Sequence, residues 1–142
     1  DRFMADTNLQ NQVKGIWYFF SQGRKGAPPM PAEELAAILQ SAKDATDKIK
    51  ARGGEVLFVR TPSSNPMLAG ENMAFPRATH WDQLLALTQC PGIHFADYPS
   101  MSQFICPELS HLSPSDAILF TQALIEVLEK DKGWKFSHSK TN

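Results

Sequence analysis

The stretch Glu55-Val-Leu-Phe-Val-Arg60 places four apolar residues in a row between two charged ones. A run of apolar residues without alternation is typical of a strand that is covered on both faces, as in a parallel sheet. Gly53 and Gly54 precede the run and Pro62 follows it, so residues that interrupt regular structure mark both of its ends. The stretch therefore predicts a buried parallel strand, and the segments around it decide which kind of sheet it joins.

Helix-like segments flank this strand, and a second strand follows it. In 32–52 and 113–132 apolar residues recur every three or four positions, which predicts amphipathic helices, and Ser113 supplies an N-cap for the second of them. The segment 79–90 predicts a further helix, and 93–96 predicts a second short buried strand. The order helix, strand, helix, strand, helix indicates an α/β domain with right-handed crossovers.

The sequence predicts two strands, whereas a doubly wound sheet usually has four or more. Three explanations remain open: 1–31 contributes another strand, the chain is the C-terminal part of a larger α/β domain, or it pairs with a second copy. Residues 1–31 contain the aromatic cluster Trp17-Tyr-Phe-Phe20 followed by a loop-like Gly- and Pro-containing stretch. We interpret 1–31 as a partly ordered connector whose aromatic side chains dock within this chain or on a partner, and 32–142 as the domain portion.

Composition excludes several classes of function. The 142 residues suit one domain, and 14 Lys and Arg against 15 Asp and Glu give a net charge of −1. Without a basic excess, nucleic acid is not an expected partner. No apolar run approaches the roughly 18 residues of a transmembrane helix. Because the chain begins at Asp1, its compartment stays unknown, and an extracytoplasmic location follows only if an upstream signal or anchor exists.

Metal and cofactor signals are weak. The four histidines form no HxxxH or HExxH pattern, so we expect neither a metal site nor a cofactor. Cys90 and Cys106 lack CxxC spacing, and one disulfide or two buried free thiols are both compatible with the sequence.

Chemistry is expected in the loops that follow the two strands, because ligands of open α/β sheets bind beyond the carboxyl ends of strands. In the second of these loops, 97–113, Glu108 and His111 are three residues apart. That spacing lets the carboxylate reach the imidazole Nδ1, which would leave Nε2 free as a general base. The alternative is that both side chains are solvated or only order the entry to the last helix.

Two arginines are candidates for binding an anionic substrate group. Arg60 ends the first strand and Arg77 follows in the loop 60–78, and a guanidinium can hold a carboxylate or phosphate by two hydrogen bonds. The alternative is structural, with the arginines paired to Glu71 or Asp82 so that they hold the long loop.

From about residue 32 to 130 the chain resembles the C-terminal half of the SGNH (GDSL-like) hydrolases and their O-acyltransferase relatives. The residues that carry the resemblance are Gly53-Gly-Glu-Val-Leu-Phe-Val-Arg-Thr-Pro62, Pro76-Arg77 with Trp81-Asp82, Asp97-Tyr-Pro99 and, above all, Glu108-Leu-Ser-His-Leu-Ser-Pro-Ser-Asp-Ala117. The resemblance implies a three-layer, parallel-sheet, flavodoxin-like α/β domain of which this chain is the C-terminal portion. It also implies that His111 is the general base and that Glu108 stands in the position of the acid.

The chain departs from that family pattern in two ways. The acid is Glu where the family usually has Asp, and no Gly-Asp-Ser nucleophile block is present; Ser21, in Phe-Ser-Gln-Gly, does not match it. The resemblance therefore implies a parent esterase or O-acyltransferase acting on a small-molecule or carbohydrate acyl ester, with the isolated chain nearly inert.

Two interpretations without catalysis remain. The chain is either a non-catalytic α/β module that keeps the fold, or an interaction domain that assembles through Trp17-Tyr-Phe-Phe20, with a homo-oligomer as one form of assembly.

Overall fold

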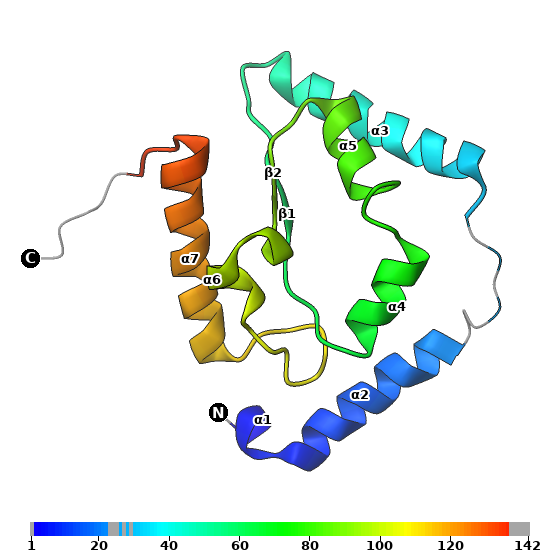
Figure 1. Ribbon diagram of the computed structural model, residues 1–142, viewed down its shortest axis with the longest axis vertical. Coiled ribbons are helices and arrows are strands. Elements are labelled where there is room, and N and C mark those ends of the chain that lie inside the picture. The colour runs from blue at the N-terminus through cyan, green and yellow to red at the C-terminus, as the bar shows by residue number, and fades with distance from the viewer. Residues whose placement is uncertain (1, 23–25, 27, 29, 137–142) are drawn as a thin grey trace, which may run out of the picture.

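The computed structural model describes residues 2–22, 26, 28 and 30–136 (Figure 1). It is mostly helical, with 62% helix and 5% strand. In chain order the elements are α1 (Arg2–Ala5), α2 (Thr7–Gln22), α3 (Ala32–Lys50), β1 (Phe58–Arg60), α4 (Met67–Ala74), α5 (Trp81–Thr88), β2 (Gly92–His94), the 3-10 helix η1 (Phe95–Asp97), α6 (Pro99–Ser102) and α7 (Pro114–Lys132).

The two strands pair in parallel, as the sequence predicts, with Val59 opposite Ile93 in the register. The prediction of a three-layer, flavodoxin-like parallel sheet is wrong, because the sheet of the described residues has two strands. The aromatic cluster in 1–31 lies in helix α2 and adds no strand, and the segment 61–78 forms α4 where a long loop was expected. Part of the loop-like stretch predicted in 21–31 lies outside the described residues.

The first strand is shorter and less covered than predicted. Val59 is 37% exposed, and Val56 and Phe58 are half-buried, so β1 is not covered on both faces. A sheet of two strands gives each strand an open edge, and the packed face of this sheet centres on Ile93 of β2, which is fully buried. Gly92 is needed beside it, because a Cβ there would come within 2.8 Å of Leu85 and Trp81 on α5.

Helix α7 supplies much of the core, and its ends follow the predicted signals. Ser113 Oγ accepts a hydrogen bond from the Asp116 N–H at 3.0 Å, and Gly133 ends the helix with a φ of 70°. The buried apolar core consists of Ile93, Phe95, Met101, Phe120, Val127 and Leu128. Figure 1 shows α7 along one side of the strands and α3 with α5 on the other, so the two strands lie between helices.

Two leucines of α7 provide a test of this packing. Leu128 is 7% exposed and belongs to the core, whereas Leu119 is 51% exposed on the same helix. Leu128→Ala should lower the free energy of unfolding by about 2–5 kcal/mol, because it removes buried methyl groups and leaves a cavity. Leu119→Ala, the matched control, should change it by about 0.5 kcal/mol or less. Equal losses in urea unfolding would contradict the orientation of α7.

Candidate functional site

The loops that follow the two strands meet at one end of the sheet. The Ser64 N–H donates to the Leu109 carbonyl oxygen at 2.9 Å, and the Cys106 N–H donates to Ser64 Oγ at 2.8 Å. Ser63 is buried beside this junction. The loop after β1 therefore braces the loop that carries Glu108 and His111.

The predicted contact between Glu108 and His111 is present. Glu108 Oε1 lies 2.7 Å from His111 Nδ1 and also accepts the His111 backbone N–H at 2.6 Å. The intervening Leu109 has a φ of 85°, in the left-handed region that non-glycine residues rarely adopt, and this tight turn lets the carboxylate reach the residues that follow it. The contact is confirmed, and the catalytic role of the pair stays a prediction.

The two side chains of the pair differ sharply in exposure. The Glu108 side chain is 4% exposed, whereas that of His111 is 77% exposed. An ionised carboxylate can only accept hydrogen bonds, so its contact places the imidazole proton on Nδ1. That tautomer leaves Nε2 as a proton acceptor on a ring that solvent reaches, which is the arrangement a general base needs.

Hydrogen bonds keep the buried carboxyl group ionised. Burial by itself raises the pKa of Glu108, but donors from Trp17, His111 and Ser110 outweigh burial, and the pKa lies below its ordinary value. Glu108 is consequently a carboxylate at neutral pH, the state that can orient an imidazole and stabilise its charged form.

Trp17 and Ser110 belong to this site, although the sequence did not single them out for it. Trp17, on α2, donates its indole N–H to Glu108 Oε2 at 2.6 Å across 91 residues of sequence. Ser110 Oγ lies 3.0 Å from both carboxylate oxygens and 2.8 Å from His111 Nδ1. The only sequence signal for Trp17 was its place in an aromatic cluster expected to dock; spacing says nothing about its partner.

The two predicted substrate-binding arginines are engaged by carboxylates of the chain. Arg60 contacts Glu71 at 2.5 Å, and Arg77 holds Asp97 by two hydrogen bonds of 2.5 and 2.9 Å. A further bond of 3.3 Å joins Arg77 to Asp82, so the structural pairings that the sequence suggested, with Glu71 and Asp82, are present. The hydrogen bonds from Arg77 hold the pKa of Asp97 below its usual range. Substrate binding by either arginine stays a prediction.

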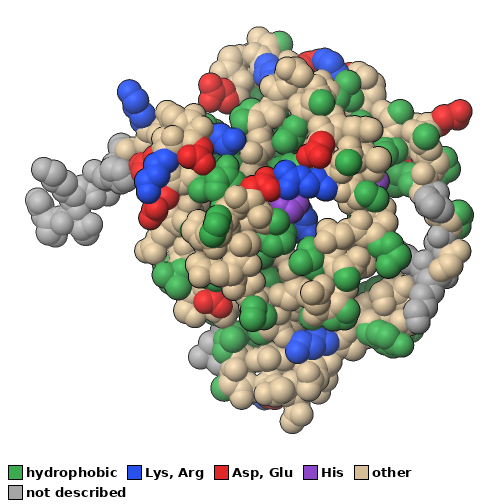
Figure 2. Space-filling view, viewed as in Figure 1, with side chains coloured by type: hydrophobic (Ala, Val, Ile, Leu, Met, Phe, Trp, Pro, Cys, Tyr) green, Lys and Arg blue, Asp and Glu red, His purple; other side chains and the backbone are tan. Residues whose placement is uncertain are grey.

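Both arginines line a cavity of about 450 Å³ that includes neither Glu108 nor His111. Its apolar walls come from α3, α5, Phe58 and Phe75, and the polar part of its lining is Arg60, Glu71, Asn72, Arg77, His80 and His94. Burial, with Arg77 nearby, lowers the pKa of His94. Figure 2 shows acidic, basic and histidine side chains gathered near the middle of one face of the molecule.

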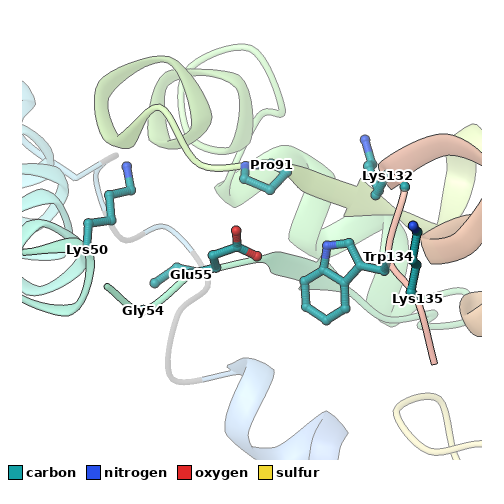
Figure 3. A pocket seen from close by; sticks show the side chains of 9 residues that line it. Lys50, Gly54, Glu55, Pro91, Lys132, Trp134 and Lys135 are labelled. Atoms are coloured by element: carbon teal, nitrogen blue, oxygen red, sulfur yellow. The ribbon is translucent and has the colours of Figure 1, made fainter. Parts of the chain in front are cut away.

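A second hollow, of about 630 Å³, also lies apart from the Glu108–His111 pair. Lys50 approaches it from one side and Lys132 with Lys135 from the other, while Glu55 and Trp134 lie between them (Figure 3). Lys50 Nζ donates to the Thr88 carbonyl oxygen at 2.6 Å, so this ammonium already has a partner. Neither hollow brings the predicted arginines to the predicted base.

Other candidate chemistry is limited within the described ranges. Cys90 and Cys106 are free buried thiols, and burial raises the pKa of Cys106. Among the residues that the structure describes, no three His, Cys, Asp or Glu side chains gather as metal ligands would. No helix in this part of the chain has the length and apolar character to cross a bilayer.

No family model, curated protein or solved structure matches this chain. Any function assigned to Glu108 and His111 therefore rests on their geometry and on the sequence motif around them.

Acid should destabilise the chain partly through Glu108. Because its pKa is lowered in the folded state, the stability it contributes is present at neutral pH and is lost as the pH falls through the folded-state pKa. Glu108→Gln should lower the free energy of unfolding by about 1–3 kcal/mol at neutral pH. The free energy of unfolding of this variant should also fall less between about pH 5 and pH 3 than that of the wild type.

Urea unfolding over a pH series measures both effects. Glu126→Gln is the matched control, because the Glu126 side chain is 64% exposed and pairs with Lys130, whose side chain is also exposed. The control should keep the acid dependence of the wild type. An unchanged acid dependence in Glu108→Gln would contradict the assignment of a buried, hydrogen-bonded carboxylate.

Proposed function

We propose that Glu108 and His111 are the acid and the base of a Ser-dependent acyl-transfer site in an SGNH-like esterase or O-acyltransferase. The observation that carries the proposal is the 2.7 Å contact between a buried carboxylate and the Nδ1 of an exposed imidazole. This is the acid–base half of a Ser-His-acid machine, in which the acid orients the base and does not itself take the proton.

The chemistry assigned to the pair is proton transfer. As a serine hydroxyl attacks the acyl carbonyl, His111 Nε2 takes the hydroxyl proton and the C–O bond to the acyl carbon forms. The same nitrogen then returns the proton to the departing alcohol, leaving an acyl-serine that water or another alcohol cleaves by the reverse sequence. Glu108 stays ionised and stabilises the imidazolium that forms in between.

Two further features support this function. The motif Glu108-Leu-Ser-His-Leu-Ser resembles the final block of the SGNH family. The left-handed Leu109 lies inside that motif, and strained backbone of this kind clusters at functional sites. Acyl esters of small molecules or carbohydrates are the proposed substrates, with Arg60 and Arg77 as binding groups only for a substrate that displaces Glu71 and Asp97.

The proposed nucleophile is a serine outside the 142 residues of this sequence. Ser110 is the nearest serine, but its Oγ contacts Nδ1 and the carboxylate and so lies on the wrong nitrogen for activation by Nε2. Ser21 does not match the nucleophile motif of the SGNH family, and its hydroxyl donates to the Tyr18 carbonyl oxygen on α2.

One observation favours a second candidate, a non-catalytic α/β module. Glu108 accepts hydrogen bonds from the backbone of Ser110 and His111 in its own loop, as a purely loop-ordering carboxylate would. In that case His111 is an exposed residue that takes no part in proton transfer.

A natural coding sequence that extends upstream of Asp1 separates the two candidates. The acyl-transfer proposal predicts a strand followed by Gly-Asp-Ser there, and turnover of p-nitrophenyl acetate by the longer chain. His111→Ala should then reduce kcat/KM by about three orders of magnitude or more, because nucleophile, base and acid act as a unit. Glu108→Gln should reduce it less, and the exposed Glu126→Gln control should leave it unchanged.

The 142-residue chain alone should show neither a burst nor turnover of this ester. Robust turnover by that chain would show that it contains a nucleophile that the proposal misses. An upstream sequence without a serine block, or an active longer chain indifferent to His111→Ala, would overturn the acyl-transfer proposal and leave the non-catalytic module.

A further inference from the structure

We infer that Trp17 is a positioning residue that couples the docking of helix α2 to the tautomer of His111, acting through Glu108. The inference rests on the proposed function for its biological meaning, but its physical content is a property of the imidazole ring that is measured without substrate. It assigns a role to the aromatic cluster that neither the motif nor the resemblance explains.

The hydrogen bonds divide between the two oxygens of Glu108. Oε1 faces His111 and accepts its Nδ1 at 2.7 Å and its backbone N–H at 2.6 Å. Oε2 faces α2 and accepts the Trp17 indole N–H at 2.6 Å. A carboxylate held at both oxygens cannot rotate freely, so the bond at Oε2 keeps Oε1 directed at Nδ1.

Trp17 is also the donor to Glu108 that comes from a distant part of the described chain. The other donors belong to Ser110 and His111, within the same loop. Ser110 Oγ cannot replace the indole, because its single proton is within reach of both carboxylate oxygens and so gives Oε2 no hydrogen bond of its own. Without Trp17, the buried Oε2 has no full hydrogen bond of its own, which favours rotation of the carboxylate or entry of water.

Helix α2 lies at the edge of the described molecule, and most of its residues are exposed. None of its described residues is buried, and among the described elements it packs closely only against α1. Figure 1 shows α2 along one edge of the molecule, outside the group formed by the strands, α5, α6 and α7. Its other aromatic side chains are exposed, with Tyr18 at 65%, Phe19 at 73% and Phe20 at 63%.

The Trp17–Glu108 bond joins this helix to the loop that carries His111. Docking of α2 then stabilises the arrangement in which Glu108 accepts from Nδ1, and Nε2 is left free as the base. Coupling of this kind is reciprocal, so the arrangement of the Glu108–His111 pair also favours the docked helix. Detachment of α2 would weaken the base without touching it, which makes α2 a regulatory element of the proposed site.

The test is nitrogen NMR of the His111 imidazole in the 142-residue chain. The spectra are recorded at a pH well above 6.5, which is about the ordinary pKa of an imidazole. The wild type should show the His111 proton mainly on Nδ1. Trp17→Phe keeps an aromatic ring and removes the donor, and the ratio of the Nδ1–H to the Nε2–H form should fall by about fivefold or more, as for the loss of one hydrogen bond to a charged group. Tyr18→Phe, the neighbouring control on α2, should leave the ratio unchanged.

A second variant covers a failure of Trp17→Phe to fold. Trp17→benzothienylalanine replaces the indole N–H by sulfur in a ring system of nearly the same shape, so it removes the donor alone. Circular dichroism establishes that each variant is folded. An unchanged tautomer ratio in a folded donor-less variant would overturn the inference, whatever the chain does to esters.

The two proposals fail separately. A tautomer that depends on Trp17 in a chain whose longer form ignores His111→Ala would sustain the coupling and overturn the acyl-transfer function. A longer chain that needs His111, with a tautomer indifferent to Trp17, would sustain the function and overturn the coupling.

Discussion

The structure around the candidate site depends on one constraint: a carboxylate that is removed from water has to be surrounded by donors. An ionised carboxyl group that is buried without partners is destabilised by several kcal/mol. Glu108 meets this requirement with donors from three residues, Trp17, Ser110 and His111. Each of these donors has to lie within hydrogen-bonding distance of the carboxylate, which constrains the backbone that carries it. The local conformation is therefore set largely by the hydrogen bonds of one side chain.

The contacts that hold Glu108 in place extend beyond its own loop. The left-handed Leu109 turns the chain so that the carboxylate can accept from the residues that follow it. The bonds from Ser64 to Leu109 and from Cys106 to Ser64 brace this turn against the loop after β1. At the other end of the turn, Ser113 caps α7, whose buried face anchors the segment to the core. The two-stranded sheet contributes chiefly by bringing the ends of β1 and β2 together.

The candidate acid and the candidate substrate-binding arginines belong to two separate groups of charged side chains. Around Glu108 the negative charge is met by neutral donors and by the imidazole. Around the cavity beside α3 and α5, Arg60 and Arg77 are met by Glu71 and Asp97. Because those guanidinium groups already have carboxylate partners, an anionic ligand would have to compete with them. The geometry therefore supports the proposed proton transfer at the exposed His111 ring, and it gives both arginines structural partners within the chain.

Features set by neighbours in the sequence could be predicted without a structure. The N-cap of α7 and the reach of Glu108 to His111 follow from propensities and from a spacing of three residues, because such groups stay close in almost any compact fold. The parallel direction of β1 and β2 could be predicted for another reason: a helix lies between two buried apolar runs, which is typical of a crossover between parallel strands. The number of strands, the contact of Trp17 with Glu108 and the pairing of Arg77 with Asp97 were decided by tertiary structure alone. They join groups 20 to 91 residues apart, and which distant groups meet depends on how the helices pack, which local pattern does not encode.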